Sequence, residues 1–297
     1  MGGIESWGTS AIQALQSFST PALDTFFKLV TLLGDEKFYL LLLPLVYWCF
    51  DKRLGMRLAV LVMASNTVNL WIKFALGLPR PPGALVRHMT EGEGPGFPSG
   101  HTQSVTVACG YLVAHVQRWR AHLMAAALVL LVGLSRIYLG VHFPHDVLGG
   151  LVIGYVLVFL FVKGTSLGEG AWRSLGRLVR YGLAAGGPLL LFLAWPLEDA
   201  AGSLGALAGF GLGALLEGER LGFQTAGSGR QRALRFLVGG GGVAALYFGR
   251  KVVLPPAVGW RFVRYATVGL FGTALAPWLF VRLGLARSEL AAAYGSE

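Results

Sequence analysis

Charged side chains are scarce in this 297-residue sequence: 13% of the residues are charged, whereas 54% are hydrophobic. Soluble domains usually contain about 25% charged residues, so the composition excludes an ordinary soluble enzyme. Cysteine is also rare, since only Cys49 and Cys109 occur, both in apolar runs without ligand-type side chains nearby. We therefore expect neither a disulfide framework nor a cysteine metal site.

Apolar segments that are long enough for membrane helices recur along the whole chain. We predict spanning helices at residues 36–50, 53–76, 99–117, 121–141, 145–164, 181–195, 200–216, 231–249 and 260–284. Residues 8–33 are expected to form an interfacial helix, because Ile12, Leu15 and Phe18 recur at helical spacing between polar residues. The predicted fold class is all-α, a polytopic membrane helical bundle.

The net charge of +10 could indicate nucleic-acid binding, but the positions of the cations favour a membrane protein. With the predicted spans, most Lys and Arg residues, such as Lys52, Arg118 and Lys163, fall on one side of the membrane. The positive-inside rule identifies that side as cytoplasmic. A basic stripe for nucleic acid would not alternate with helix direction in this way, so no nucleic-acid partner is expected.

Three short polar blocks stand at the ends of apolar segments. They are Lys73 with Arg80-Pro81, then Pro98-Ser99-Gly100-His101, then Ser135-Arg136 followed by His142 and Asp146. With the predicted topology, all three blocks open on the non-cytoplasmic side. The sequence therefore predicts one ionic pocket at the boundary between hydrocarbon and water.

The cations of these blocks suit a phosphate group. A phosphate monoester carries close to two negative charges, and its transfer needs compensating positive charge, which Lys73, Arg80 and Arg136 can supply. Ser99 and Gly100 come at the start of an apolar helix, where backbone N–H groups lack intrahelical acceptors and favour an anion. No cluster of metal ligands is visible in the sequence, so we expect no metal and no other cofactor.

Two histidines and a carboxylate can carry the chemistry. His142 and Asp146 are four residues apart, so the carboxylate can bond one imidazole nitrogen and leave the other neutral for attack on phosphorus. His101 follows the phosphate-binding residues directly and is the natural proton donor to the departing alkoxide. Two histidines with different neighbours can hold opposite protonation states in one site.

The blocks read Lys-x6-Arg-Pro, Pro-Ser-Gly-His and Ser-Arg-x5-His-x3-Asp, in that order. This resembles the type 2 phosphatidic acid phosphatase superfamily, also called lipid phosphate phosphatases. The resemblance implies a helical bundle that works without a metal. It implies that His142 attacks phosphorus to form a phosphohistidine, that Asp146 orients His142, and that His101 protonates the leaving group and later activates water. Lys73, Arg80, Ser99, Gly100 and Arg136 match the phosphate-binding positions.

The motifs cover only the first part of the chain. We predict a catalytic membrane core with its interfacial helix at residues 1–165, and a transmembrane extension of about four helices at residues 166–297. The extension is expected to shield the core from lipid, to shape the entry for the lipid tail, or to mediate homodimerisation. The segment Leu33-Gly34-Asp35-Glu36 resembles the sphingosine-phosphate phosphatase branch.

The predicted function is hydrolysis of a phosphomonoester or diphosphate of a membrane lipid on the non-cytoplasmic face. The substrate candidates are undecaprenyl diphosphate, phosphatidate, phosphatidylglycerol phosphate and sphingosine phosphate. Arginine outnumbers lysine 19 to 6, and together with abundant Ala and Gly this indicates a GC-rich prokaryote and an inner-membrane location. Such a source favours a cell-wall carrier lipid or a glycerolipid over a sphingoid base. One alternative is a transporter or lipid-binding protein that holds the phosphate headgroup without cleaving it. A haloperoxidase is a third option, because related soluble enzymes hold vanadate in a similar pocket, but the predicted membrane spans argue against it.

Other polar residues and glycines are expected to have structural roles. We interpret His88, His115, His122 and His145 as helix caps or polar contacts. Asp35 and Glu36 either face the mouth of the pocket or cap the helix that follows. Gly205, Gly209 and Gly213, together with the run Gly239–Gly242, predict close packing between helices.

Overall fold

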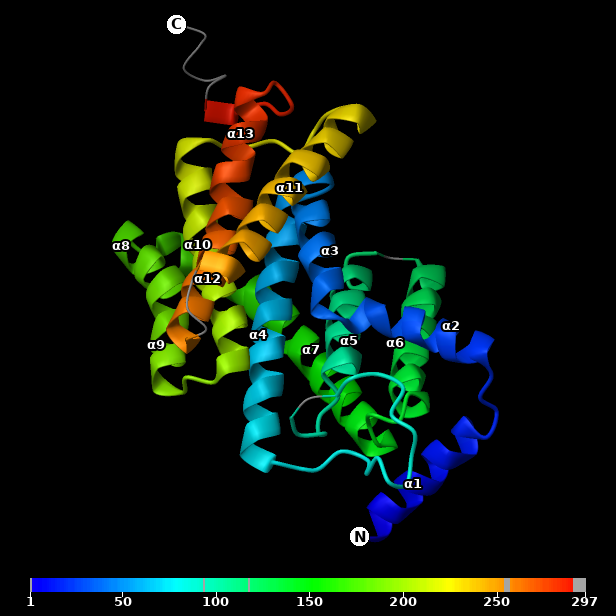
Figure 1. Ribbon diagram of the computed structural model, residues 1–297. Helices are drawn as coiled ribbons and strands as arrows, with labels where there is room; N and C mark the ends of the chain where they lie inside the picture. Colours follow the sequence, from blue (N-terminus) through cyan, green and yellow to red (C-terminus); the bar gives the residue numbers. More distant parts are fainter. Residues whose placement is uncertain (1, 93, 117, 254–256, 291–297) are drawn as a thin grey trace, which may run out of the picture. The chain divides into compact units, whose positions relative to one another are not determined.

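A computed structural model describes residues 2–92, 94–116, 118–253 and 257–290 (Figure 1). These residues are almost entirely helical and contain no strand beyond one isolated bridge between Phe223 and Ser288. The all-α prediction is therefore confirmed. The helices are α1 (Gly3–Gln16), α2 (Pro21–Thr31), α3 (Glu36–Cys49), α4 (Lys52–Leu76), α5 (Gly100–Val113), α6 (Trp119–Tyr138), α7 (Pro144–Ser174), α8 (Arg177–Tyr181), α9 (Gly187–Ala194), α10 (Glu198–Arg220), α11 (Gly229–Val253), α12 (Val258–Leu270) and α13 (Ala276–Arg282).

The chain divides into two compact units. The N-terminal unit contains the residues up to Phe38 together with Ser65–Ser166, and the C-terminal unit contains Tyr39–Ala64 together with the residues from Leu167 onward. Helices α3, α4 and α7 run from one unit into the other, because each contains a boundary residue. Residues 39–64 therefore pack with the C-terminal residues, although they precede the motifs in the sequence.

Five helical segments of the described chain are long and apolar enough to cross a membrane: Lys52–Leu76, Trp119–Tyr138, Pro144–Ser174, Arg177–Ala194 and Glu198–Arg220. The predicted spans at 36–50 and 99–117 correspond to α3 and α5, which have 14 residues each. At 1.5 Å per residue such a helix covers about 21 Å, less than the roughly 30 Å of a bilayer core. The predicted spans at 231–249 and 260–284 are helical but are not among the five.

The predicted interfacial helix at residues 8–33 is two helices, so this detail of the prediction is wrong. Helix α1 ends at Gln16, and α2 begins at Pro21 with Thr20 as its N-cap, whose side chain accepts a hydrogen bond from the Leu23 N–H. Proline has no N–H and is favoured at a first helical position but not inside a helix. The Thr20-Pro21 pair therefore ends one helix and starts the next.

The N-terminal unit is held together by small apolar clusters between α1, α2, α5 and α6. Val30 of α2, Val105 of α5, and Val129 and Val132 of α6 form one buried cluster. These β-branched side chains lose little rotamer freedom on packing, because their χ1 angles are already restricted. Burial of each such side chain stabilises the fold by about 1.5–3 kcal/mol relative to exposure.

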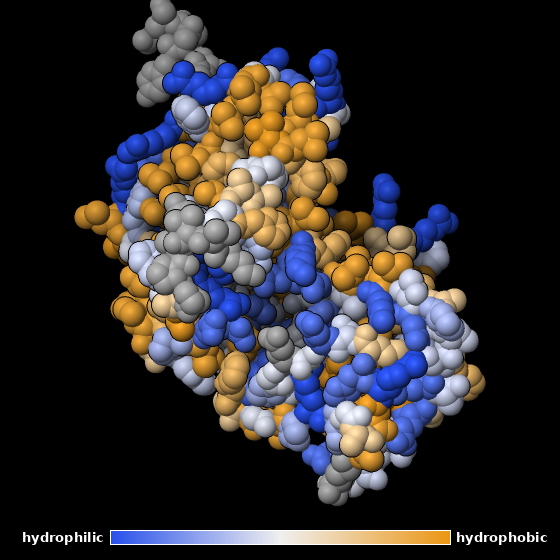
Figure 2. Space-filling view, in the orientation of Figure 1, coloured by the Kyte–Doolittle hydropathy of each residue, from blue (hydrophilic) through white to orange (hydrophobic). Residues whose placement is uncertain are grey.

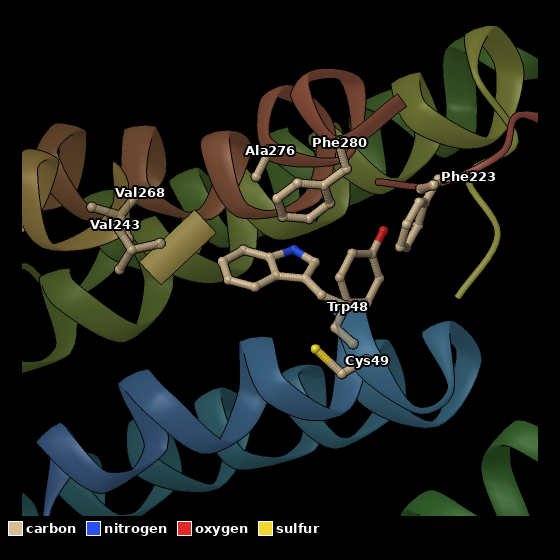
Figure 3. Close-up of a cluster of buried hydrophobic side chains, with 9 residues drawn as sticks. Trp48, Cys49, Phe223, Val243, Val268, Ala276 and Phe280 are labelled. Atoms are coloured by element: carbon tan, nitrogen blue, oxygen red, sulfur yellow. The ribbon is translucent and has the colours of Figure 1, made fainter. Parts of the chain in front are cut away.

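The core of the C-terminal unit surrounds the end of α3 (Figure 3). Trp48 is fully buried, stacks edge-on against Phe280 with ring centroids 5.4 Å apart, and donates from Nε1 to the Gly272 carbonyl at 2.8 Å. Gly272 lies in a π-helical turn, Phe271–Leu275, between α12 and α13. The Gly272 carbonyl of this turn thus provides the acceptor that the buried indole N–H of Trp48 needs.

Glycines permit close packing of α10 against α12 and the adjoining π-helical turn. A Cβ atom on Gly205 would lie 2.2 Å from the Phe262 carbonyl oxygen, and one on Gly209 would lie 1.9 Å from the Ala266 carbonyl oxygen. The prediction of close helix packing is confirmed at these glycines and at Gly213. In the second run it holds for Gly239 and Gly242, whereas Cβ atoms on Gly240 and Gly241 would meet no neighbouring atom within 4 Å.

Large apolar side chains are exposed on the outer surface of several helices, and apolar areas are broad in the space-filling view (Figure 2). On α7, Leu148, Val152 and Phe159 have exposed fractions of 58%, 58% and 61%. In a soluble monomer, extensive apolar patches mark sites of interaction. Here they lie on a helix that is long and apolar enough to span a bilayer, so they fit a lipid-facing surface.

Candidate active site

The structure brings the predicted site residues into the N-terminal unit. They occupy the end of α4 (Lys73), the α4–α5 connection (Arg80, Ser99), the first two residues of α5 (Gly100, His101), the last turn of α6 (Arg136), the α6–α7 connection (His142) and the first turn of α7 (Asp146). These four helix ends and the two connections between them therefore supply every predicted site residue.

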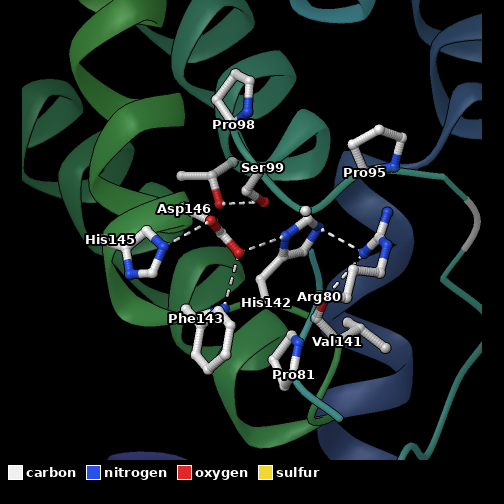
Figure 4. A network of polar contacts seen from close by, with 12 residues as sticks. Arg80, Pro81, Pro95, Pro98, Ser99, Val141, His142, Phe143, His145 and Asp146 are labelled. Carbon is white, nitrogen blue, oxygen red and sulfur yellow. Dashed lines mark hydrogen bonds and ion pairs between the residues drawn. The ribbon is translucent and has the colours of Figure 1, made fainter. Parts of the chain in front are cut away.

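His142 and Asp146 form a buried pair, with exposed fractions of 2% and 0% (Figure 4). His142 Nδ1 lies 3.3 Å from Asp146 Oδ2, which also accepts the Phe143 backbone N–H at 2.9 Å. On its other side, His142 Nε2 lies 3.2 Å from Arg80 Nη1, which can only donate. These partners assign the proton of the ring to Nδ1 and the lone pair to Nε2.

Burial, followed by the charges of Arg136, Arg80 and Lys73, lowers the pKa of His142 well below its usual range. Both causes act in the same direction, because each disfavours the imidazolium form. His142 is therefore neutral at pH 7, as a nitrogen nucleophile must be.

The side chains of Lys73 and Arg80 reach the loop that precedes Pro98. Lys73 is 8% exposed, and its Nζ donates to the Pro95 carbonyl at 2.6 Å. Arg80 donates from Nε to the Gly94 carbonyl at 2.9 Å and from Nη1 to the Val141 carbonyl at 2.8 Å. Burial lowers the pKa of Arg80, while the nearby Asp146 carboxylate opposes that shift.

Arg136 is almost completely buried, with an exposed fraction of 3%. It donates from Nη1 to Thr31 Oγ1 at 2.7 Å, and its Nε finds no acceptor within the described part of the chain. A guanidinium carries five N–H donors, and the bond to Thr31 uses one of them. The planar arrangement of the donors suits two parallel hydrogen bonds to two oxygens of an anion.

The start of α5 packs against the start of α7. The Ser99 backbone N–H donates to the Asp146 carbonyl at 2.9 Å, so this N–H is not available to an anion. The anion-binding character predicted for the α5 N-terminus therefore rests on the backbone N–H groups from Gly100 onward. The positive charges of Arg136, Arg80 and Lys73 lie close enough to His101 to oppose its protonation. A positive charge on His101 in turn opposes protonation of His142.

The sequence analysis did not identify a buried polar network behind this site. Asn69 Nδ2 donates to Gln103 Oε1 at 2.8 Å, and Gln103 Nε2 donates to Ser65 Oγ at 2.8 Å. Asn69 lies four residues before Lys73, on the same face of α4, so helical spacing could have suggested a link. Nothing in the sequence could have paired Thr31 with Arg136, because 105 residues separate them.

Most of the structural interpretations agree with the contacts. His88, His115 and His122 each lie within 2.8–3.1 Å of a backbone carbonyl oxygen. Asp35 accepts the Lys37 N–H at 2.9 Å and so caps the start of α3. His145 differs, because its Nε2 lies 3.3 Å from Asp146 Oδ1 and thus contacts the carboxylate of the site. The part of the chain that the structure describes holds no group of three or more His, Cys, Asp or Glu residues arranged for a metal ion.

Two family models match the chain. "PAP2 superfamily" matches residues 54–166, which include all eight predicted site residues, and "PAP2 superfamily phosphatase, transmembrane extension" matches residues 201–288. The second match and the five apolar helices together identify the chain as an integral membrane protein.

Similarity to characterised proteins is concentrated in the same region. The chain is 28% identical over 179 residues to the probable sphingosine-1-phosphate phosphatase of Dictyostelium discoideum, covering 53% of this chain and 44% of that protein. It is 35% identical over 150 residues to phosphatidylglycerophosphatase B of Bacillus subtilis (strain 168), covering 46% of this chain and 71% of that protein. The chain spans about half the length, or less, of several curated relatives that it matches.

The fold is also similar to that of a solved protein. The crystal structure of a transmembrane PAP2 type phosphatidylglycerolphosphate phosphatase from Bacillus subtilis matches with a TM-score of 0.50 and 24% identity, covering 56% of this chain and 88% of that chain. This likeness concerns the helical fold alone.

Proposed function

This chain belongs to the PAP2 superfamily, and we propose that it is a membrane phosphatase that hydrolyses a phosphate ester or diphosphate of a membrane lipid. One observation carries the proposal. A buried neutral imidazole, that of His142, contacts the Asp146 carboxylate on one side and Arg80 on the other, and it lies within electrostatic reach of Arg136 and Lys73. This arrangement suits attack on a dianionic phosphate group.

In the first step, the lone pair on His142 Nε2 attacks phosphorus while the bond to the lipid oxygen breaks. Arg80 Nη1 exchanges its contact with Nε2 for a phosphate oxygen, which frees the nucleophile. Asp146 balances the positive charge that develops on the imidazole as the phosphohistidine forms. The alkoxide leaves with a proton from His101, whose protonated form is stabilised by the bound phosphate.

In the second step, water replaces the lipid alcohol. Neutral His101 takes a proton from the water, whose oxygen attacks phosphorus while the bond to His142 Nε2 breaks. Inorganic phosphate leaves, and both imidazoles return to their starting states. Lys73, Arg80 and Arg136 keep the transferring group neutralised through both steps.

A lipid substrate is favoured by the apolar surface of the helices and by relatives named for lipid phosphates. We assign the site to the non-cytoplasmic face of a prokaryotic inner membrane, on the distribution of Lys and Arg. For the C-terminal unit, we propose that the apolar helices shield the core or join two copies in a homodimer. The substrate candidates remain undecaprenyl diphosphate, phosphatidate, phosphatidylglycerol phosphate and sphingosine phosphate.

The decisive experiment measures phosphate release by the full chain in detergent, with these four lipids and a soluble sugar phosphate as substrates. We expect His142→Ala and His101→Ala to lose at least about a thousandfold in rate, because removal of a member of a catalytic group usually costs that much. His122→Ala is the matched control, since His122 contacts only the Arg118 carbonyl among the residues described. Near-normal turnover by His142→Ala would remove the proposed nucleophile. Lipid binding by the wild-type protein without any release would favour a transporter or lipid-binding protein.

A further inference from the structure

The two carboxylate oxygens of Asp146 have different partners. Oδ2 faces His142 Nδ1 and the Phe143 backbone N–H, whereas Oδ1 faces His145 Nε2 at 3.3 Å (Figure 4). Oδ1 makes no hydrogen bond within the described part of the chain, and its recorded polar contact is this approach of His145 Nε2. The carboxylate thus lies between two imidazoles, of which the proposed mechanism uses only one.

A buried carboxylate needs such a second partner. Asp146 is fully buried, so bulk water cannot satisfy its oxygens, and an ionised oxygen without a donor is costly in that environment. Rotation about the Asp side chain's last torsion is also soft. A donor on Oδ1 therefore both lowers the cost of the charge and fixes the direction in which Oδ2 points.

Aromatic packing directs the His145 ring toward this oxygen. The ring stacks on Phe143 with centroids 5.2 Å apart and planes 17° from parallel, and on Phe97 at 6.5 Å and 27°. Phe97 itself is held close to α7, since a Cβ atom on Gly149 would lie 2.2 Å from its ring. The orientation of His145 is thus set by its stacking on Phe143 and Phe97.

The environment of the ring also selects its tautomer. His145 Nδ1 is buried and meets no hydrogen-bond partner among the described residues. A proton on Nδ1 would bury an unsatisfied donor and turn the Nε2 lone pair toward the carboxylate. A proton on Nε2 avoids both costs and supplies the donor that Oδ1 lacks.

We propose that His145 is a positioning residue for the reaction: its Nε2–H donates to Asp146 Oδ1 and holds Oδ2 against the nucleophilic imidazole of His142. This inference rests on the proposed phosphatase function. In the free protein the 3.3 Å approach lacks hydrogen-bond geometry, since Oδ1 makes no hydrogen bond among the described residues. Catalytic hydrogen bonds are often poorly aligned before the substrate binds, and this one aligns as positive charge develops on His142. The competing explanation is that His145 only fills space between the two phenylalanine rings.

Two variants separate these explanations because they remove opposite properties. His145→Gln keeps a donor where Nε2 lies but loses the stacked ring, and His145→Phe keeps the ring but loses the donor. The assay compares kcat and KM for the panel lipid that the wild-type protein hydrolyses fastest. We expect His145→Phe to lose about 10- to 100-fold in kcat, the effect of one hydrogen bond to a charged group, with KM within about twofold. His145→Gln should stay within about threefold of wild type in kcat.

The reverse order of the two variants would overturn the inference, and so would equal rates for His145→Phe and wild type. If His145→Phe does not fold, His145→Gln decides alone, because a rate tens of times below wild type with the donor retained contradicts the proposal. Thermal unfolding of each variant in detergent separates loss of fold from loss of positioning. Wild-type protein that hydrolyses no panel lipid would overturn the phosphatase function as well as this inference, whereas active wild type with an equally active His145→Phe overturns the inference alone.

Discussion

Replacing Asp146 with Asn tests whether the site needs a negative charge or only a hydrogen-bond acceptor. The substitution is nearly isosteric. The amide oxygen can take the place of Oδ2 and accept from the Phe143 N–H and from His142 Nδ1, which lie 2.9 and 3.3 Å from it. The amide NH2 then faces His145 Nε2, so the His145 ring must carry its proton on Nδ1 in this variant in order to accept from the amide. The orientation of His142 is thus kept, while the charge beside it is lost.

The magnitude follows from the geometry of the pair. When His142 becomes phosphorylated it gains positive charge, and the Asp146 carboxylate 3.3 Å away stabilises that charge. Unit charges about 4 Å apart attract by about 4 kcal/mol at an effective dielectric constant near 20. Both side chains are almost completely buried, so solvent screening removes little of this energy. A loss of about 4 kcal/mol corresponds to roughly a thousandfold decrease in kcat.

The assay combines steady-state phosphate release with rapid-quench detection of the phosphoenzyme. We expect Asp146→Asn to slow formation of the phosphoenzyme by about a thousandfold, while KM is unchanged or lower because a negative charge near the phosphate is removed. Asp146→Ala is the comparison variant, since it also leaves the buried Phe143 N–H without its acceptor and should cost an additional 1–3 kcal/mol or so of stability. Activity of Asp146→Asn within about tenfold of wild type would refute the charge argument.

Two further predictions concern pH and packing. Because the pKa of His142 is lowered by burial and by neighbouring cations, the unfolded chain binds a proton that the folded chain does not once pH falls below about 6.5. The stability contributed by neutral His142 is present above that pH and decreases as pH falls toward the lowered pKa. In thermal unfolding between pH 5 and 8, the unfolding midpoint of His142→Gln should therefore decrease less at low pH than that of the wild type. The same pH dependence of the midpoint in both proteins would contradict the shift. Gly209→Val should lower the unfolding midpoint by several degrees, because a Cβ atom would lie 1.9 Å from the Ala266 carbonyl oxygen and overpacking costs about 1–3 kcal/mol. Gly168→Ala is the control, because an added Cβ atom at Gly168 would meet no neighbouring atom within 4 Å, and it should be neutral or slightly stabilising. Equal destabilisation by Gly209→Val and Gly168→Ala would contradict the packing argument.

Motif spacing predicted the candidate site better than hydropathy predicted the helix ends. Lys73, His101 and Asp146 lie in the terminal turns of α4, α5 and α7, and Arg80 and His142 lie in the connections beside them, because each block follows or precedes an apolar segment that must end near the same boundary. The predicted span at residues 99–117 extends past α5, which ends at Val113 with Ala114 as its C-cap, because Ala114 and Val116 are still apolar; residue 117 lies outside the described residues. Hydropathy does not report where backbone hydrogen bonds stop, so helix ends need capping or turn signals.

Contacts that depend on side-chain orientation could not be predicted from spacing. The role of His145 depended on which oxygen of Asp146 each imidazole meets, a property of ring orientation and not of spacing. The break between α1 and α2 could have been predicted, since Thr20-Pro21 is a helix-start signal inside an otherwise periodic stretch. The apolar periodicity of residues 8–33 obscured that signal.

The N-terminal helices form part of the site, although they carry none of its motifs. Thr31 of α2 accepts the hydrogen bond from Arg136, and Gln16 of α1 bonds both the N–H and the carbonyl of Arg87 in the α4–α5 connection, at 3.0 and 2.7 Å. Arg136 is otherwise a buried cation whose Nε meets no acceptor within the described chain, which is costly unless an anion binds beside it. The neutral hydroxyl of Thr31 orients this guanidinium and leaves its positive charge in place. A carboxylate in the same position would neutralise that charge. We therefore expect the affinity of the proposed site for phosphate to depend on α2 as well as on the residues of the three blocks, and Thr31→Val should weaken phosphate binding more than any effect on folding explains.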